Sequence, residues 1–186
     1  MIRPLCALLL VLHTGLALAD TELGMAAKAG NLAKVQELVA AGADVNAIDP
    51  QDTWERTALM QAARMGNVEV VKFLLGKGAD VTRQGDATGA SPLKAAAYKG
   101  YLEVVQALLA AGAAPDFNTD EEGRSPLLWA IIGKEQDAPA IVAALLKAGA
   151  NSRAVFDSFS GEKIPAAVLA AKAGPEIEAA FNANAH

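Results

Sequence analysis

Side chains able to carry out nucleophilic or acid–base chemistry are scarce in this sequence. The single cysteine, Cys6, and one of the two histidines, His13, both lie within the first twenty residues. The other histidine, His186, is the last residue and follows a run of Asn and Ala, where a fold cannot hold it in catalytic geometry. Thiolate chemistry, Cys-ligated metal sites and a Ser-His-Asp triad are therefore excluded from the rest of the chain.

Carboxylates remain for acid–base chemistry, and Asp120 with Glu122 is the pair that a hydrolase would use. Together with Asp116 and Glu121 they form an acidic run that contains a single base, Arg124. The run is either a solvated loop tip or an electrostatic contact for a basic partner. Calcium would need a ligand spacing and a glycine turn that this run lacks. No orienting group or metal-ligand cluster accompanies the pair, so we expect no enzyme, metal or cofactor.

The first nineteen residues have the three-part pattern of a secretory signal peptide. Arg3 supplies the positive end, residues 5–12 form an apolar block, and Ala17 and Ala19 supply a small-residue cleavage site. The apolar block is short beside the ~20 residues of a bilayer span, which disfavours the alternative of an uncleaved anchor helix. We expect cleavage after Ala19, one continuous domain over residues 20–186, and localisation in the periplasm, or outside the cell if the chain is not retained.

Charge excludes two classes of partner. The chain has 16 basic and 21 acidic residues, a net charge of −5, and removal of Arg3 with the signal peptide leaves 15 − 21 = −6. Nucleic-acid binding requires clustered Lys and Arg, whereas the basic residues here are spread among acids. An anionic membrane surface is disfavoured likewise, so we expect no membrane contact after signal cleavage. The expected partner is another exported protein.

The rest of the chain contains a sequence pattern that recurs at a strict interval, and this pattern must position the candidate functional residues. Segments that begin at Thr57, Ser91 and Ser125 each have Leu two residues later and then Ala, and their starts are separated by 91 − 57 = 34 and 125 − 91 = 34 residues. Each segment is followed by a glycine, and in the first two copies a second apolar segment and a further glycine follow it, with Gly66 and Gly78 in the first copy. Such self-similarity predicts a repeat architecture.

Each unit is expected to form a hairpin of two short helices. Ser or Thr can cap the first helix, and Pro is tolerated at the next position. Gly66 can adopt the left-handed conformation that ends that helix. In the second helix Val71, Leu74 and Leu75 recur at i, i+3 and i+4 and would form one buried stripe. One hairpin cannot bury such a stripe alone, so the units must stack.

The pattern resembles the ankyrin repeat family, through the Thr/Ser-Pro-Leu-x-x-Ala start, the glycine in mid-unit and the Leu-Leu-x-x-Gly-Ala-Asp ending at residues 74–80. The resemblance covers roughly residues 21–181 and implies an all-α solenoid of stacked helix-turn-helix units with projecting β-hairpin-like fingers. Tetratricopeptide repeats share the period but lack the Gly-Ala-Asp ending. The family commonly has His at the fourth motif position, where this chain has Met60, Lys94 and Leu128, so a hydrogen bond of that turn is expected to be missing.

We expect units at about 21–54, 55–88, 89–122 and 123–160, and a C-terminal cap at 161–182. The fourth copy carries four extra residues. The first and last copies lack the Pro-Leu start and are expected to cover the apolar ends of the array. Residues assigned to these two caps are Met25, Leu32, Val35 and Leu38 in the first and Val168, Leu169, Ile177 and Phe181 in the last.

The resemblance implies that partners bind at the fingers and at a concave palm lined by the first helices. Trp54, in the first finger, is either an interface anchor or packs over the first repeat. Phe156, in the last finger, either covers the C-terminal cap or forms a second apolar contact. Trp129, on a first helix, is either core or palm. The residues expected to contact a partner are Trp54, Arg56, Arg64, Arg83, Tyr98, Asp120, Glu121, Glu122, Arg124 and Phe156.

The resulting hypothesis is a monomeric, non-enzymatic interaction scaffold in the periplasm of a Gram-negative bacterium. The resemblance to small exported bacterial ankyrin proteins leaves two specific alternatives open. One is an immunity or inhibitor protein that masks a toxic effector or enzyme, and the other is an accessory protein of a periplasmic oxidative-stress enzyme such as catalase. A purely structural role in an envelope assembly is a further alternative.

Overall fold

The computed structural model describes residues 21–48, 52–53, 55–85, 91–116, 124–133, 135–157 and 162–185. The predicted signal peptide and several finger residues lie outside these ranges. Within them, no helix combines the length and the apolar character that a membrane span requires.

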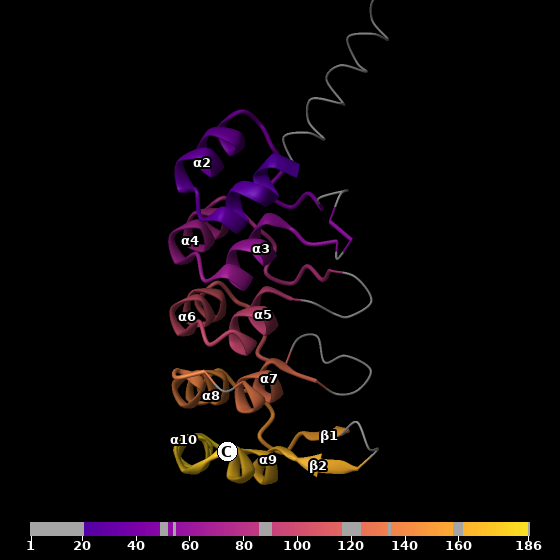
Figure 1. Ribbon diagram of the computed structural model, residues 1–186, viewed down its shortest axis with the longest axis vertical. Helices are drawn as coiled ribbons and strands as arrows, with labels where there is room; N and C mark the ends of the chain where they lie inside the picture. The colour runs from indigo at the N-terminus through magenta and orange to yellow at the C-terminus, as the bar shows by residue number, and fades with distance from the viewer. Residues whose placement is uncertain are drawn as a thin grey trace, which may run out of the picture.

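Helices follow one another in pairs along the chain (Figure 1). Residues 21–29 are helical and precede α2 (Leu32–Ala40). The next pairs are α3 (Ala58–Met65) with α4 (Val68–Gly76), α5 (Pro92–Tyr98) with α6 (Leu102–Ala110), and α7 (Pro126–Ile132) with α8 (Ala138–Lys147). The last pair is α9 (Ala166–Ala173) with α10 (Pro175–Asn184). We call the first helix of each pair the inner helix and the second the outer helix.

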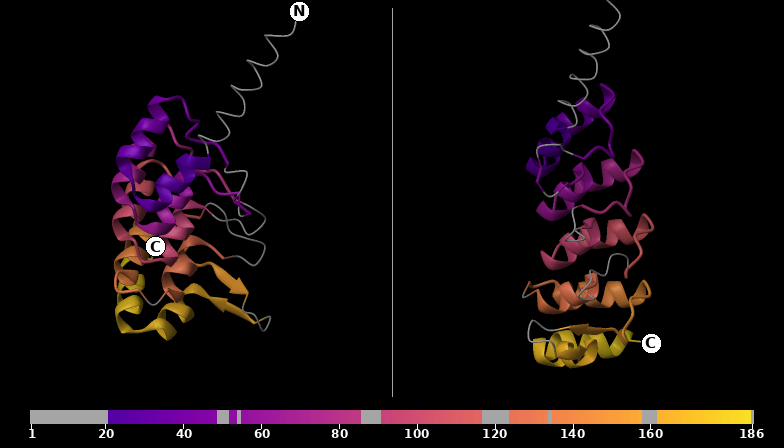
Figure 2. Two further views of the ribbon diagram at one scale, coloured as in Figure 1. Left: turned by 45° about the horizontal axis from the view of Figure 1, so that its top comes forward. Right: turned by 90° about the vertical axis from the view of Figure 1, so that its right-hand side faces the viewer.

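The pairs stack so that inner and outer helices form two columns (Figure 1). Between α8 and α9 the chain forms a two-stranded antiparallel hairpin, β1 (Val155–Asp157) and β2 (Lys163–Pro165), with Phe156 opposite Ile164. Figure 2 shows that this hairpin projects away from the helices. The architecture confirms the predicted all-α solenoid with a projecting hairpin.

The predicted helix-start signals form hydrogen bonds in the structure. The Thr57 hydroxyl accepts from the Met60 amide at 3.3 Å, and Ser91 and Ser125 accept from the amides of Lys94 and Leu128 at 3.2 and 3.4 Å. Each bond satisfies one of the amides that a helix N-terminus leaves unpaired. Gly66 ends α3 with φ of 75°, the left-handed conformation expected of it.

Three apolar side chains are less buried than the sequence pattern predicts. In α4, Val71 and Leu74 are fully buried as predicted, but Val70 completes the buried set and Leu75 is only half-buried. Met25 and Val168 lie in the two end units, where the sequence predicts them, but their side chains are exposed. Val168 lies on the last inner helix, which has a neighbouring unit on one side alone. Leu23, Ala26 and Ala27, rather than Met25, carry the buried face of the first inner helix.

Polar side chains join the first unit to the second. The Asn67 side-chain amide donates to the carbonyls of Ala27 and Lys28, at 2.8 and 3.1 Å, and so satisfies the C-terminal end of the first inner helix. At the base of the fingers the Asp80 amide donates to the Asn46 side chain at 2.7 Å. Packed helix pairs likewise belong to one unit or to adjacent units. The array is therefore held together by nearest-neighbour contacts.

Candidate protein-binding surface

The inner helices present one row of side chains along the array. The row comes from the fourth and seventh residues after each helix cap, such as Gln61 and Arg64 after Thr57. These two positions share a face of the helix because they are three residues apart. The eighth position extends the row. We call this row the inner stripe and define it by the residues Met25, Lys28, Gln61, Arg64, Tyr98, Lys99, Trp129, Ile132, Leu169 and Lys172. All of these side chains are exposed or half-buried except Gln61, which is buried.

The centre of the inner stripe is aromatic. Tyr98 of α5 and Trp129 of α7 pack edge to face, with ring centroids 5.0 Å apart and an angle of 79° between the ring planes. The Lys99 ammonium lies 5.4 Å from the centroid of the Tyr98 ring. Tyr98 nevertheless remains 45% exposed, so much of its ring faces solvent. Large, rigid aromatic rings in such a position are typical anchors for a protein interface.

Unsatisfied polar atoms also gather on the inner stripe. Within the described ranges, the buried side-chain polar atoms that lack a hydrogen-bond partner are Gln61 Oε1, Arg64 Nε and Trp129 Nε1. All three residues occupy the fourth or seventh position of an inner helix. An unmade hydrogen bond at a buried group costs about 1–3 kcal/mol, and because the protein itself covers these atoms, a partner could pair with them only after neighbouring side chains move.

The charge of the inner stripe is opposite to that of the chain. Its basic residues are Lys28, Arg64, Lys99 and Lys172, and none of the residues that define the stripe is acidic, whereas the whole chain has a net charge of −5. A local field of one sign steers partners of the other sign toward it.

At the C-terminal end the inner stripe meets a pocket. The pocket has a volume of about 820 Å³ and lies between α7, α9 and the start of α10. Its walls are mainly apolar, with Ile132, Leu169 and Pro175 among them, and Lys172 belongs to its lining. Glu135 and Glu176 also line it and are exposed. A volume of this size can accept one or two apolar side chains of a partner.

The predicted partner-binding residues divide between the inner stripe and the loops. Arg64 and Tyr98 lie on the inner stripe. Arg83 is exposed near the base of a finger, and Arg124 is half-buried just before the cap of α7. Trp129, whose placement the sequence left open, is half-buried on the stripe.

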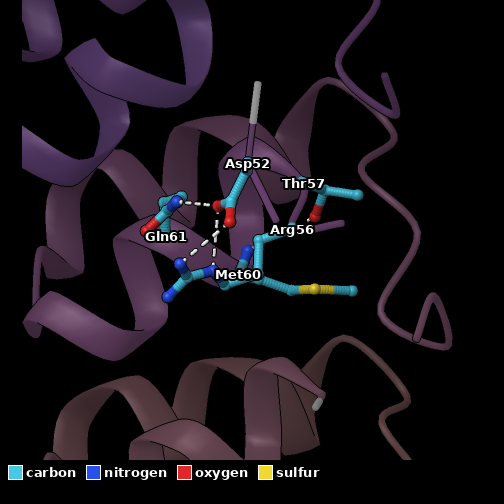
Figure 3. A network of polar contacts seen from close by, with 5 residues as sticks. All are labelled: Asp52, Arg56, Thr57, Met60 and Gln61. Atoms are coloured by element: carbon cyan, nitrogen blue, oxygen red, sulfur yellow. Dashed lines mark hydrogen bonds and ion pairs between the residues drawn. The ribbon is translucent and has the colours of Figure 1, made fainter. Parts of the chain in front are cut away.

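Arg56, by contrast, takes part in a polar network that stabilises the structure (Figure 3). Its Nε and Nη2 donate to the two carboxylate oxygens of Asp52, both at 2.9 Å, and the Gln61 amide donates to the same carboxylate at 2.5 Å. The side chains of Arg56 and Asp52 are only 16% and 7% exposed. The network joins Asp52 and Arg56, which precede α3, to Gln61 within α3. The Arg56 guanidinium is therefore hydrogen-bonded within the fold.

Phe156 also has a structural position. It is 2% exposed and belongs to the core, which corresponds to the packing alternative and leaves no ring surface for a partner. Burial of one face of the short β1–β2 hairpin explains this position, since alternate strand residues face the same side. Trp54, Asp120, Glu121 and Glu122 lie outside the described residues.

Sequence reasoning missed Lys28, Lys99 and Lys172 as surface residues. Their signal was available, because Lys28 and Lys172 share the register of Arg64 and Tyr98 within the helical unit and Lys99 follows one position later. The pocket had no comparable signal, since it depends on how the lengthened fourth unit meets α10.

Within the part of the chain that the structure describes, no group of three or more His, Cys, Asp or Glu side chains is placed to hold a metal ion.

Comparison with known proteins agrees with the repeat pattern. A family model described as ankyrin repeats (3 copies) matches residues 5–85, 23–119 and 84–155. Together these matches span well over half of the chain. No curated protein sequence matches it.

Proposed function

The chain belongs to the ankyrin repeat family, whose domains generally act as non-enzymatic scaffolds for protein–protein interaction, and we propose that it performs this role on another exported protein in the bacterial periplasm. The observation that carries the proposal is the inner stripe. It offers a partly aromatic and basic row of side chains along the inner helices, with buried, unsatisfied hydrogen-bonding atoms beneath it. Export rests on the pattern of residues 1–19.

Two narrower roles agree with the same features. An immunity or inhibitor protein would cover the active surface of a toxic effector or enzyme. An accessory protein would bind an oxidative-stress enzyme such as a periplasmic catalase. The negatively charged chain with a basic inner stripe would recognise either partner by charge as well as shape. These roles differ in partner, so identification of the partner chooses between them.

Export is tested by fractionation and N-terminal sequencing of the protein produced from its full sequence in a Gram-negative host. We expect recovery in the periplasmic fraction with Asp20 as the first residue. Recovery in the cytoplasm with an intact N-terminus would refute the export proposal.

Binding is tested by cross-linking in intact source cells, followed by affinity purification and mass spectrometry. We expect one exported protein to be recovered in a fixed ratio to the chain. A matched sample from cells that lack the chain removes proteins that bind the resin. Failure to recover any protein above this background would refute the scaffold role.

A further inference from the structure

We propose that the inner stripe binds an extended acidic segment of the partner protein, with carboxylates over the inner helices of the first three units and an apolar side chain in the pocket beside α9. The proposal rests on the scaffold function and adds the chemistry and polarity of the bound segment. Charge, unsatisfied atoms and shape support it separately.

The basic residues of the inner stripe indicate that the first half of the bound segment is acidic. Lys28, Arg64 and Lys99 come from three consecutive units and stand on one face. Arg64 is half-buried and its Nε has no acceptor within the protein. A carboxylate suits it best, because guanidinium–carboxylate hydrogen bonds are charge-assisted and stronger than bonds to neutral acceptors.

Main chain along the stripe would offer partners to the unsatisfied atoms once the side chains that cover them move on binding. Gln61 is 6% exposed, and its Oε1 needs a donor, whereas the Nε1 of Trp129 needs an acceptor. The other end of the Gln61 amide is already bound to Asp52, which fixes the orientation of its oxygen (Figure 3). An extended peptide presents both N–H donors and C=O acceptors at regular intervals. A row of carboxylates alone would leave Gln61 Oε1 unpaired.

The pocket indicates that the other half of the bound segment carries an apolar side chain. The pocket beside α9 is mainly apolar, and it begins at Ile132, which is 42% exposed. Among the described residues of the pocket lining, Glu135 and Glu176 outnumber Lys172, the one basic residue, so the pocket would repel carboxylates and the acidic residues belong at the opposite end of the stripe. The segment therefore has a direction, with its acidic part near Arg64 and its apolar residue near Leu169.

The length of the segment follows from helix packing. The path from the first inner helix, which carries Lys28, to α9 crosses four helix–helix spacings of roughly 8–10 Å each, or about 32–40 Å. A fully extended chain advances about 3.3–3.6 Å per residue, so about nine to twelve residues bridge this distance.

The test selects binders from a phage library of random peptides, with the purified chain as the target. We expect selected peptides to be rich in Asp and Glu and to carry an apolar residue toward one end. Increasing the salt concentration should weaken their binding, since the contacts are between charged groups. Selection of neutral or basic peptides, or of none, would overturn the proposal.

Variants then locate the binding site by fluorescence anisotropy of a selected peptide. Arg64→Gln and Lys99→Gln should each weaken affinity by about tenfold, as expected for loss of a hydrogen bond to a charged group. Trp129→Phe keeps a ring but removes Nε1, and it should weaken binding as well. The matched control is Lys72→Gln on outer helix α4, which removes the same charge and should change affinity by less than about twofold. Helical circular dichroism verifies that each variant is folded.

Repeating the cross-linking with these variants separates the two proposals. Recovery of the cellular partner should fall with Arg64→Gln and Lys99→Gln but not with Lys72→Gln. Equal recovery from all three would retain the scaffold function and overturn the acidic-segment proposal. If no form recovers a partner, the scaffold function fails, and the peptide measurements still decide whether the inner stripe prefers acidic segments.

Discussion

The ion pair between Asp52 and Arg56 is expected to contribute far more stability than an ion pair on an outer helix. Asp52 accepts two hydrogen bonds from the Arg56 guanidinium and a third from Gln61, and both charged side chains are largely shielded from water. Removing one member of a buried pair costs about 3–5 kcal/mol, because the other charge stays behind. Partial exposure of Arg56 places Asp52→Ala at the lower end, about 3 kcal/mol. For a chain of this length, the unfolding temperature should fall by roughly 6–12 °C.

A double-mutant cycle isolates the pair from the other contacts of Asp52. The variants are Asp52→Ala, Arg56→Ala and the double variant, and the free energy of unfolding comes from urea titration. We expect a coupling of about 1.5–3 kcal/mol. The matched cycle uses Glu69 and Lys72 of α4, whose side chains are 71% and 58% exposed, and should give less than about 0.5 kcal/mol. Equal couplings in the two cycles would refute the assignment of Arg56 to the fold.

Three further predictions concern the backbone and the joints between units. Gly66→Ala should destabilise the fold more than Gly42→Ala. Both glycines have positive φ, but of the two only Gly66 would place the new methyl group within 2.8 Å of the Tyr101 ring. Urea titration compares the two variants, and equal losses of stability would contradict a steric cause. Asn67→Ala should cost about 1–3 kcal/mol by leaving carbonyls of the first inner helix unpaired, and hydrogen exchange in residues 21–29 should then accelerate. Hydrogen bonds from Thr82 hold the pKa of Asp80 below its ordinary value of 3.8, so the Asp80 carboxylate stabilises the fold above that pH and loses this contribution as the pH falls through the lowered pKa. Asp80→Asn should therefore flatten the pH dependence of the urea midpoint in that acidic range. An unchanged slope would contradict this reasoning.

The repeat architecture was predictable because its signals are local and recur. A Thr or Ser that caps a helix and a glycine that ends it act within a few residues, and Thr57 and Gly66 behave as expected. Burial of Val71 and Leu74 followed from the helical period. Leu75 lies at the edge of the same period, where packing against neighbours decides how far a side chain is covered.

The surface was predictable only in part. Arg64 and Tyr98 followed from their position on the first helices of an ankyrin-like unit. The Asp52 network did not, because it joins a loop residue to a helix nine residues later and no periodic pattern specifies that pairing. Arg56 therefore looked available to a partner when read from its position in the loop.

The joints between units also bear on how this molecule can change. Asn67 and Asn46 reach only the preceding or following unit, and the helices pack in the same restricted way. A substitution on the exposed row of one inner helix therefore has few routes by which to distort a distant pair. Specificity for a new partner can then be acquired one unit at a time, while the remaining units keep the affinity already present.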